Sequence, residues 1–276
     1  MKDVETAVAE HYGNAGLLDR IIAALQAGGI DLQQLTPDDL APVDEFHTGG
    51  RKATRHAVAK LLPKSDQHVL DVGCGIGGAA RFMAAETGCR VTGIDLTPDY
   101  IATAKALTQH TGQSDEVQFE TASALAMPFA DAAFDGVLTI HMAMNIHKRA
   151  ALYAEIARVM KPGARLCIYD MMKKNDEPIA FPVPWADGPE TSHLTTPDDM
   201  RALLSAAGFE VVEVEDRSDI ARDFFRQRLN APSAAPPALG IHIVLGQSAR
   251  QKFENTLANI EAGRLGPVQI IARRKA

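Results

Sequence analysis

The chain has 276 residues, of which 46% are hydrophobic and 23% charged, and its net charge is −7. This composition supplies a sizeable core, and the acidic balance argues against a nucleic-acid partner, which requires a basic face. No apolar run approaches the length of a membrane span and the first residues lack the apolar core of a signal peptide, so we expect a cytoplasmic protein without membrane insertion.

The first sixty residues precede any strand signal and are typical of helices. Apolar residues at helical spacing predict a helix over residues 17–27, and the Gly28-Gly29 pair ends it. The proline-bearing stretches "TPDDL" and "APVDEF" are expected to be irregular, and a helix resumes over residues 51–62. The sequence therefore predicts an N-terminal helical cap over residues 1–62.

From residue 63 onward, predicted strands and helices alternate. The expected strands cover residues 67–72, 89–95, 116–120, 134–140, 164–170, 209–215 and 266–274. Helices are expected over residues 77–86, 98–110 and 197–208, and another containing Leu152 is stopped by Pro162. This order predicts an α/β core over residues 63–276, with a mainly parallel sheet between helices.

Two segments interrupt the alternation. Residues 171–195 are rich in proline and polar groups and are expected to form a loop. Residues 217–265 are expected to form a mostly helical insertion before the last strand, interrupted by "APSAAPPALG" over residues 231–240. Long insertions at a functional edge are usually binding elements, so this interruption is a candidate hinge or lid.

The stretch "VLDVGCGIGGAARF", residues 69–82, places Gly73, Gly75 and Gly78 in a G-x-G-x-x-G pattern between a strand and a helix. Asp95 ends the next strand about twenty residues later, where its carboxylate could accept hydrogen bonds from ribose hydroxyls. Alternatively, the glycines only form a tight turn and Asp95 caps the next helix. Cys74, Cys89 and Cys167 lack C-x-x-C spacing and indicate free thiols, and no ligand cluster predicts a metal site.

Four segments together resemble the class I S-adenosylmethionine-dependent methyltransferases: "VLDVGCGIGGAARF", "VTGIDLTPDYIATAKAL", "MPFADAAFDGVLTIHMAMNI" and "EIARVMKPGARLCIYD". The resemblance covers residues 66–216. The flanking "DEFHTGGRKATR" and "PVPWADGPE" are similar to the bacterial branch that includes sarcosine and dimethylglycine N-methyltransferases. The resemblance implies S-adenosylmethionine as cofactor and a Rossmann-like seven-stranded sheet in the order 3-2-1-4-5-7-6, with strand 7 antiparallel.

The resemblance also implies roles for residues that follow the first three strands. Those implied to contact the methionine part of the cofactor are Asp71, Gly73 and Gly75. Asp95 is implied to bind the ribose and Leu96 to lie against the adenine. Ser123 and Ala124 occupy the place where the family usually has an acidic residue that reads the adenine amino group.

Further candidates lie at the ends of the fourth and fifth strands, where ligands bind in open α/β sheets. We expect one crevice to be faced by His141, Asn145, Tyr169 and Asp170. Alternatively, His141 is only a satisfied strand-end group and Tyr169 a half-buried aromatic. His141 is also a candidate cofactor contact. If the acceptor is a hydroxyl, His141 or His193 is the candidate general base.

The acceptor and carboxylate sites have candidates outside these strands. Trp185, between two prolines, could form a wall that suits an ammonium group or could be a hydrophobic plug. Arg51 offers a planar fork for a carboxylate of the cofactor or of an amino-acid substrate, or is a surface arginine. Tyr12 and His47 are further candidate substrate contacts.

The residues and the resemblance together predict methyl transfer from S-adenosylmethionine to a small-molecule acceptor. The first expectation is N-methylation of a glycine-type amine such as sarcosine or dimethylglycine. O- or C-methylation of a small metabolite or lipid is the alternative, and a dinucleotide oxidoreductase or a noncatalytic cofactor-binding protein represents other classes. A homodimer is left open.

Overall fold

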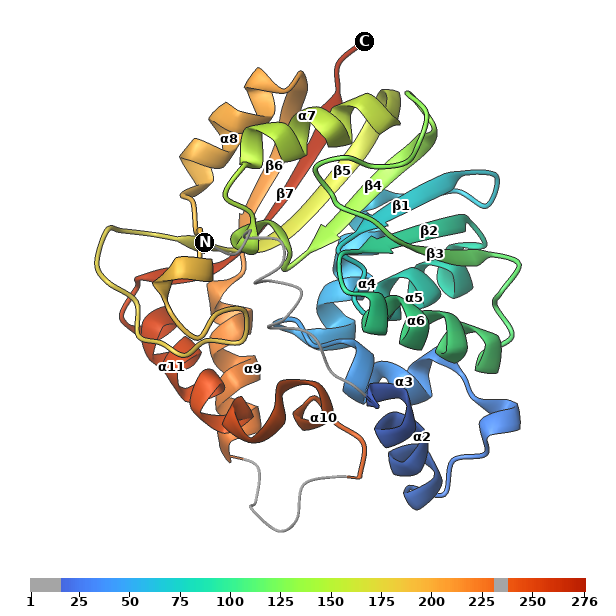
Figure 1. The fold of residues 1–276 in the computed structure, drawn as a ribbon. Helices are drawn as coiled ribbons and strands as arrows, with labels where there is room; N and C mark the ends of the chain where they lie inside the picture. Colours follow the sequence, from blue (N-terminus) through green and yellow to red (C-terminus); the bar gives the residue numbers. More distant parts are fainter. Residues whose placement is uncertain (1–15, 231–237) are drawn as a thin grey trace.

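A computed structural model describes residues 16–230 and 238–276, and its centre is one seven-stranded sheet in the order β3-β2-β1-β4-β5-β7-β6 (Figure 1). The strands are β1 (His68–Val72), β2 (Arg90–Asp95), β3 (Val117–Thr121), β4 (Phe134–Ile140), β5 (Met160–Lys173), β6 (Phe209–Asp216) and β7 (Leu265–Arg274). Strands β1 to β5 pair in parallel, and β7 pairs antiparallel with both β5 and β6. The predicted order and the antiparallel last strand are confirmed.

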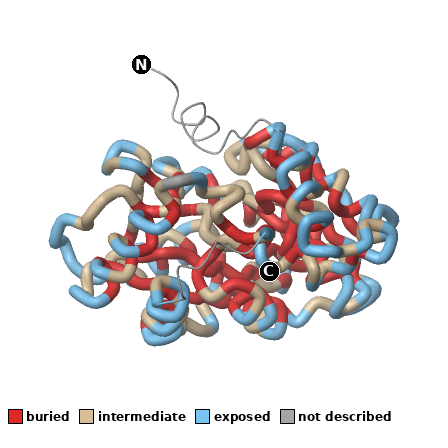
Figure 2. Tube along the Cα trace, turned by 90° about the horizontal axis from the view of Figure 1, so that it is seen from below, coloured by how far each residue is buried: buried red, intermediate tan, exposed pale blue. Residues whose placement is uncertain are grey.

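Helices cover both faces of the sheet. On one face lie α4 (Gly50–Leu61), α5 (Gly78–Thr87) and α6 (Pro98–His110), and on the other lie α7 (Arg149–Val159) and α8 (Pro197–Ala206). The central strands are buried on both sides, which explains why β1 and β4 are near-continuous apolar runs. Figure 2 shows buried chain through the middle of the molecule and exposed chain around its rim.

Two further groups of helices lie beyond the carboxyl ends of the parallel strands. The N-terminal pair is α2 (Leu17–Ala27) and α3 (Pro37–Asp44), and the insertion between β6 and β7 contains α9 (Ser218–Asn230), α10 (His242–Leu245) and α11 (Ala249–Glu261). Helix α10 contacts both α2 and α3, so the two groups meet over the sheet edge (Figure 1). The proposed hinge over residues 231–240 lies mostly outside the described residues. A domain division at residue 62 stays a prediction.

Two expected elements are corrected by the structure. The stretch expected to be irregular contains α3, because Thr36 and Asp39 form a capping box in which each side chain accepts the other's backbone N–H. Strand β5 continues through Met171 to Lys173, where a loop was expected, because these residues pair with residues 265–267 of β7. This partner lies ninety residues away in the sequence, so local pattern could not reveal it.

Candidate active site

A cavity of about 500 Å³ lies at the carboxyl ends of β1, β2 and β4, within the size range of small-molecule sites. The N-terminal segment before α4, the loop after β4 and the loop around Trp185 complete its walls. Predicted site residues that line the cavity are His47, Asp71, Gly73, Gly75, Asp95, Leu96, Ser123, Ala124, His141, Asn145 and Trp185. Chain segments far apart in the sequence are thus brought together as the strand-end positions predicted.

The glycine turn after β1 makes room for neighbouring side chains. Gly73 and Gly75 have φ angles of +77° and +54°, in the left-handed region that favours glycine. A Cβ atom at Gly73 would lie 2.3 Å from Cγ of Met142, and one at Gly75 would lie 2.7 Å from the Phe46 ring. The close packing of Met142 and Phe46 therefore requires glycine at both positions.

Asp95 joins the glycine turn to the next helix. One carboxylate oxygen accepts the Gly75 N–H at 3.0 Å and the other accepts the Thr97 N–H at 2.9 Å. Burial raises the pKa of this carboxyl, and the bonds from Thr97 and Gly75 act in the opposite direction. Asp95 therefore ties the glycine turn to Thr97, the residue before α6, and each of its oxygens also keeps acceptor capacity beside the cavity.

Asp71 is the last but one residue of β1 and is buried, and its Oδ2 atom has no hydrogen-bond partner among the described residues. Burial, followed by the charges of Asp95 and Glu45, raises the pKa of Asp71 to about 7. A buried carboxyl beside two other acids favours a cationic partner. The ammonium group of a methionine moiety fits this position.

His141 begins the loop after β4 in a left-handed conformation with φ +49°, which is uncommon for a residue other than glycine. Its backbone N–H donates to the Tyr169 carbonyl at 2.7 Å, and Asp170 accepts the next two backbone N–H groups. Its Nε2 atom is buried and has no hydrogen-bond partner within residues 16–230 and 238–276. Burial and then the neighbouring His47 hold the pKa of His141 well below its usual value, so the ring is neutral at pH 7.

The other two predicted catalytic residues do not line the cavity. Tyr169 is fully buried, and its hydroxyl donates to the Thr48 carbonyl at 3.1 Å. The backbone N–H of His193 donates to the Met144 carbonyl at 2.8 Å, and its ring lies 5.2 Å from the His147 ring. Both residues thus lie behind the side chains that face the cavity.

Trp185 and Asn145 form one end of the cavity. The Trp185 indole is 2% exposed, and its Nε1 atom donates to the Ser192 hydroxyl at 3.0 Å. The Asn145 amide donates to the carbonyls of Trp185 at 2.8 Å and Thr191 at 3.0 Å. Trp185 both lines the cavity and belongs to a buried apolar cluster, so it combines the predicted pocket wall with the alternative of a hydrophobic plug.

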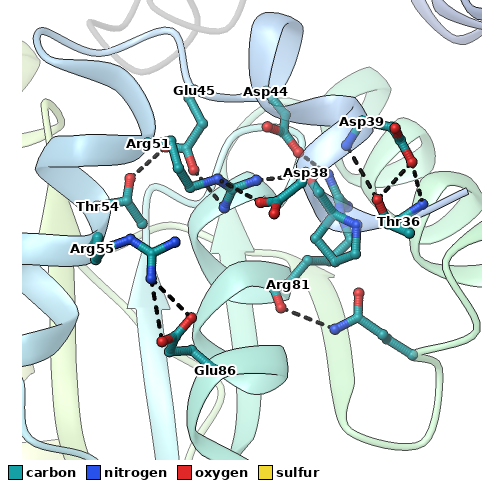
Figure 3. Close-up of polar contacts among 12 residues, drawn as sticks. Thr36, Asp38, Asp39, Asp44, Glu45, Arg51, Thr54, Arg55, Arg81 and Glu86 are labelled. Atoms are coloured by element: carbon teal, nitrogen blue, oxygen red, sulfur yellow. Dashed lines mark hydrogen bonds and ion pairs between the residues drawn. The ribbon is translucent and has the colours of Figure 1, made fainter.

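Arg51 does not reach the cavity, because its guanidinium is engaged within the cap (Figure 3). It forms a 2.8 Å ion pair with Glu45, donates to the Pro37 carbonyl at 2.6 Å and lies over the Phe82 ring. Arg51 was a candidate for a carboxylate of the cofactor or of an amino-acid substrate, and in the structure its fork holds the Glu45 carboxylate of the protein itself.

His47 is a cavity-lining neighbour of this network. Its Nε2 atom lies 3.0 Å from the Thr54 hydroxyl and 3.4 Å from Glu45, and burial lowers its pKa to about 4. Its ring is 6.0 Å from the ring of His141. The two histidines are therefore both neutral at pH 7 and share one side of the cavity.

Several cavity residues were missed from the sequence. Apolar walls come from Phe46, Tyr100, Met142, Met144 and Leu245, and Asp44 lies beside the glycine turn. Two of them, Asp44 and Phe46, lie in the "DEF" stretch directly before His47, which could have indicated them. Tyr12 lies outside the described residues. Within the part of the chain that is described, no group of three His, Cys, Asp or Glu side chains could hold a metal ion, and no helix is long and apolar enough to cross a membrane.

Comparisons with known proteins agree with this geometry. Residues 70–168 match the family model described as "Methyltransferase domain". O-methyltransferase resE of Aspergillus sclerotiorum is 32% identical over 194 residues, which cover 67% of this chain and 70% of that protein. Sterol 24-C-methyltransferase of Saccharomyces cerevisiae is 37% identical over 160 residues, but the match covers 55% of this chain and only 41% of that protein.

Solved structures share the fold at lower identity. The [4+2]-cyclase SpnF is 23% identical with a TM-score of 0.69, covering 94% of this chain and 93% of that one. A provisionally assigned sarcosine dimethylglycine methyltransferase of Galdieria sulphuraria is 20% identical with a TM-score of 0.64, covering 81% of this chain and 82% of that one. The sequence matches and the strand order show that the chain belongs to the class I S-adenosylmethionine-dependent methyltransferases, with S-adenosylmethionine as its cofactor.

Proposed function

We propose that this enzyme methylates a hydroxyl oxygen of a small, largely apolar molecule. The observation that carries the proposal is the buried, unpartnered Nε2 atom of His141 in the cavity wall, within the described residues. Hydroxyl methylation requires removal of a proton, and a neutral imidazole within reach of the hydroxyl can accept it. The similarity to an O-methyltransferase over two thirds of the chain supports the same chemistry.

The cavity lining also favours a hydroxyl acceptor over a glycine-type amine. Sarcosine and dimethylglycine carry a carboxylate, and Arg51, the fork expected to hold it, is occupied by Glu45. The side of the cavity near His141 is formed by Met142, Met144 and Trp185. A carboxylate placed beside these apolar groups would lose its hydration, and Lys148, a cation that also lines the cavity, lies at an exposed position.

The cofactor-binding roles follow from the strand ends. Asp71 would hold the ammonium of the methionine part, Asp95 would accept bonds from the ribose hydroxyls, and an apolar slot beginning at Leu96 would take the adenine. Ser123 and Ala124 line the same slot, and the Ser123 hydroxyl already accepts the Leu125 N–H. When bound, S-adenosylmethionine supplies a methyl group activated by the adjacent sulfonium.

In the proposed reaction, the chain's own residues align the acceptor and remove its proton. His141 Nε2 would accept the hydroxyl proton as the acceptor oxygen takes up the methyl group, and the ring would become an imidazolium. The C–S bond would break at the same time, and its electron pair would leave the cofactor's sulfur as a neutral thioether. Trp185, Met144 and Phe46 exclude water from the reacting atoms. Displacement at a methyl carbon requires the acceptor oxygen, the carbon and the sulfur to lie in line. The rigid cavity walls hold the acceptor in that alignment and so contribute to the rate besides the base.

A panel of acceptors tests the proposed acceptor atom. Purified enzyme with labelled S-adenosylmethionine is offered a neutral phenol, a fatty hydroxy acid, a sterol, sarcosine and dimethylglycine. We expect label on the oxygen of an apolar hydroxyl compound, located by mass spectrometry and carbon NMR of the product. Turnover confined to the amines, or label on a carbon atom, would overturn the proposal and leave the methyltransferase assignment intact.

The Asp95→Ala substitution tests the cofactor site. It removes charged acceptors from the ribose and the anchor of the Gly75 N–H, so we expect S-adenosylmethionine binding to weaken by about 1–3 kcal/mol in calorimetric titration. Glu120→Gln, on the exposed side of neighbouring β3, is the matched control and should leave binding unchanged. Binding by Asp95→Ala equal to that of the parent protein would place the ribose elsewhere.

A further inference from the structure

Helix α11 carries polar residues on a face that is buried. Lys252 is 6% exposed, and Thr256 and Asn259 are fully buried. Together with the half-buried Asn255, they recur at the three- and four-residue spacing that places side chains on one side of a helix. Buried polar groups are costly unless they are bonded, so this stripe requires partners.

The partners of the two asparagines are backbone groups of the loop that follows β5. Asn259 binds both sides of Ala180, because its Oδ1 accepts the Ala180 N–H at 2.8 Å and its Nδ2 donates to the Ala180 carbonyl at 2.9 Å. Asn255 lies one turn earlier and donates to the Pro182 carbonyl at 2.9 Å. The two asparagines therefore hold the loop through its main chain, and these contacts do not depend on the side chains of the loop.

Lys252 continues the same row toward the far side of the loop. Its Nζ lies 3.1 Å from the Asp187 carboxylate, with the lysine side chain buried and the aspartate exposed. The hydroxyl of Thr256 is satisfied within the helix, at the Lys252 carbonyl. The three loop contacts therefore follow the loop residue by residue, from Ala180 through Pro182 to Asp187.

Between these contacts the loop makes a tight turn that carries the tryptophan. Val183 and Ala186 exchange backbone hydrogen bonds of 2.8 and 3.2 Å, which places Pro184 and Trp185 at the tip. Both tip residues line the cavity. Asn145 holds the Trp185 carbonyl from the opposite side, so the turn is fixed between the loop after β4 and helix α11.

We propose that Asn255, Asn259 and Lys252 are positioning residues that hold the Trp185 turn and so determine which acceptors fit the cavity. None of the three touches the acceptor, because the loop lies between them and the cavity. The enzyme would select acceptors whose hydroxyl is carried by a rigid apolar skeleton, because that skeleton packs against the fixed Trp185 indole. This inference deepens the proposed function and rests on it for the nature of the acceptor.

Trp185 is the single tryptophan of the chain, so its fluorescence reports changes in the turn without any acceptor. We expect Asn255→Ala and Lys252→Met to shift Trp185 emission to the red and to increase its quenching by acrylamide, because the indole becomes more accessible. The acceptor KM should rise about two- to tenfold for each variant, the factor that one hydrogen bond is worth. The KM for S-adenosylmethionine should stay the same. Glu254→Ala, an exposed position on the same helix, is the matched control.

A second comparison separates loop positioning from general loss of structure. Lys252→Met combined with Asp187→Asn should cost no more acceptor affinity than Lys252→Met alone, because both changes remove the same pair. Thermal unfolding of each variant identifies any that fail to fold. Unaltered Trp185 emission and quenching in both single variants, or equal rises in KM for acceptor and cofactor, would overturn the inference. Failure of the hydroxyl proposal would instead leave the emission changes intact.

Discussion

Replacing His141 by glutamine is expected to lower kcat for a hydroxyl acceptor by about 10²–10⁴-fold, the usual contribution of a general base. Glutamine keeps the polar character and most of the size of histidine, but it does not take up a proton. His141 is in the loop after β4, whereas the residues proposed to bind the cofactor lie on β1 and β2 and in the loops after β2 and β3. Affinity for S-adenosylmethionine should therefore change little, which calorimetric titration can check beside single-turnover kinetics.

The pH dependence of the parent enzyme gives this prediction a second readout. Burial and the neighbouring His47 lower the pKa of His141 below 6.5, so its basic form persists at neutral pH. With S-adenosylmethionine saturating, so that its ammonium keeps Asp71 ionised, kcat/KM for the acceptor should stay level as pH falls to 6.5 and decline only below it, as the His141 ring gains a proton. His141→Gln should lose this acidic decline. His56→Gln, on α4 beside Glu215, is the control, and a His141→Gln enzyme with unchanged kcat would remove the base from the mechanism.

Replacing Arg81 by methionine is expected to destabilise the fold by about 3–5 kcal/mol, the cost of leaving one member of a buried ion pair alone. Arg81 and Asp44 are both fully buried, and their side chains are 2.9 Å apart (Figure 3). Arg81 also donates to the Ile76 carbonyl at 2.8 Å and to the Thr108 hydroxyl at 3.1 Å. One guanidinium therefore links the cap, the glycine turn and α6.

Denaturant unfolding at two pH values checks the origin of this loss. Burial already raises the pKa of Asp44, and without Arg81 the main opposing charge is gone. The folded variant then takes up a proton that the unfolded chain does not, so its deficit should shrink as pH is lowered. Arg55→Met, which removes an exposed pair with Glu86, should change stability by about 1 kcal/mol or less. Equal losses for the two variants would contradict the prediction.

Much of the fold could be predicted because its signals are local. The central strands β1 and β4 are short, mostly apolar runs, and β3 begins with alternating buried and exposed residues. The glycine turn and Asp95 lie at strand ends whose neighbours follow from the parallel order. Parallel strands bring their carboxyl ends to one edge, so the predicted residues at the ends of β1 to β4 line one cavity. The site was predictable wherever strand geometry alone places the side chain.

The rest depends on pairings that sequence spacing does not show. Arg51 was predicted as a ligand for a carboxylate, and the carboxylate it meets is Glu45, six residues before it in the cap. Tyr169 lies on β5, four residues before the strand ends at Lys173, and its hydroxyl donates to the Thr48 carbonyl and not to the cavity. Whether a polar side chain at a strand end faces the ligand or a protein partner is decided by what the cap and insertion bring against it.

The position of β7 determines when the sheet can be completed during synthesis of the chain. In the described sheet, β6 is joined to the other strands through β7, which lies between β5 and β6. During synthesis β6 leaves the ribosome before residues 265–274, so it has no place in the sheet until they follow. Strand β5 meanwhile presents an open edge, the kind that pairs with other chains. Translation that stalls before residue 265 would therefore leave a nascent chain whose unpaired β5 edge makes it prone to aggregate, rather than a shortened enzyme.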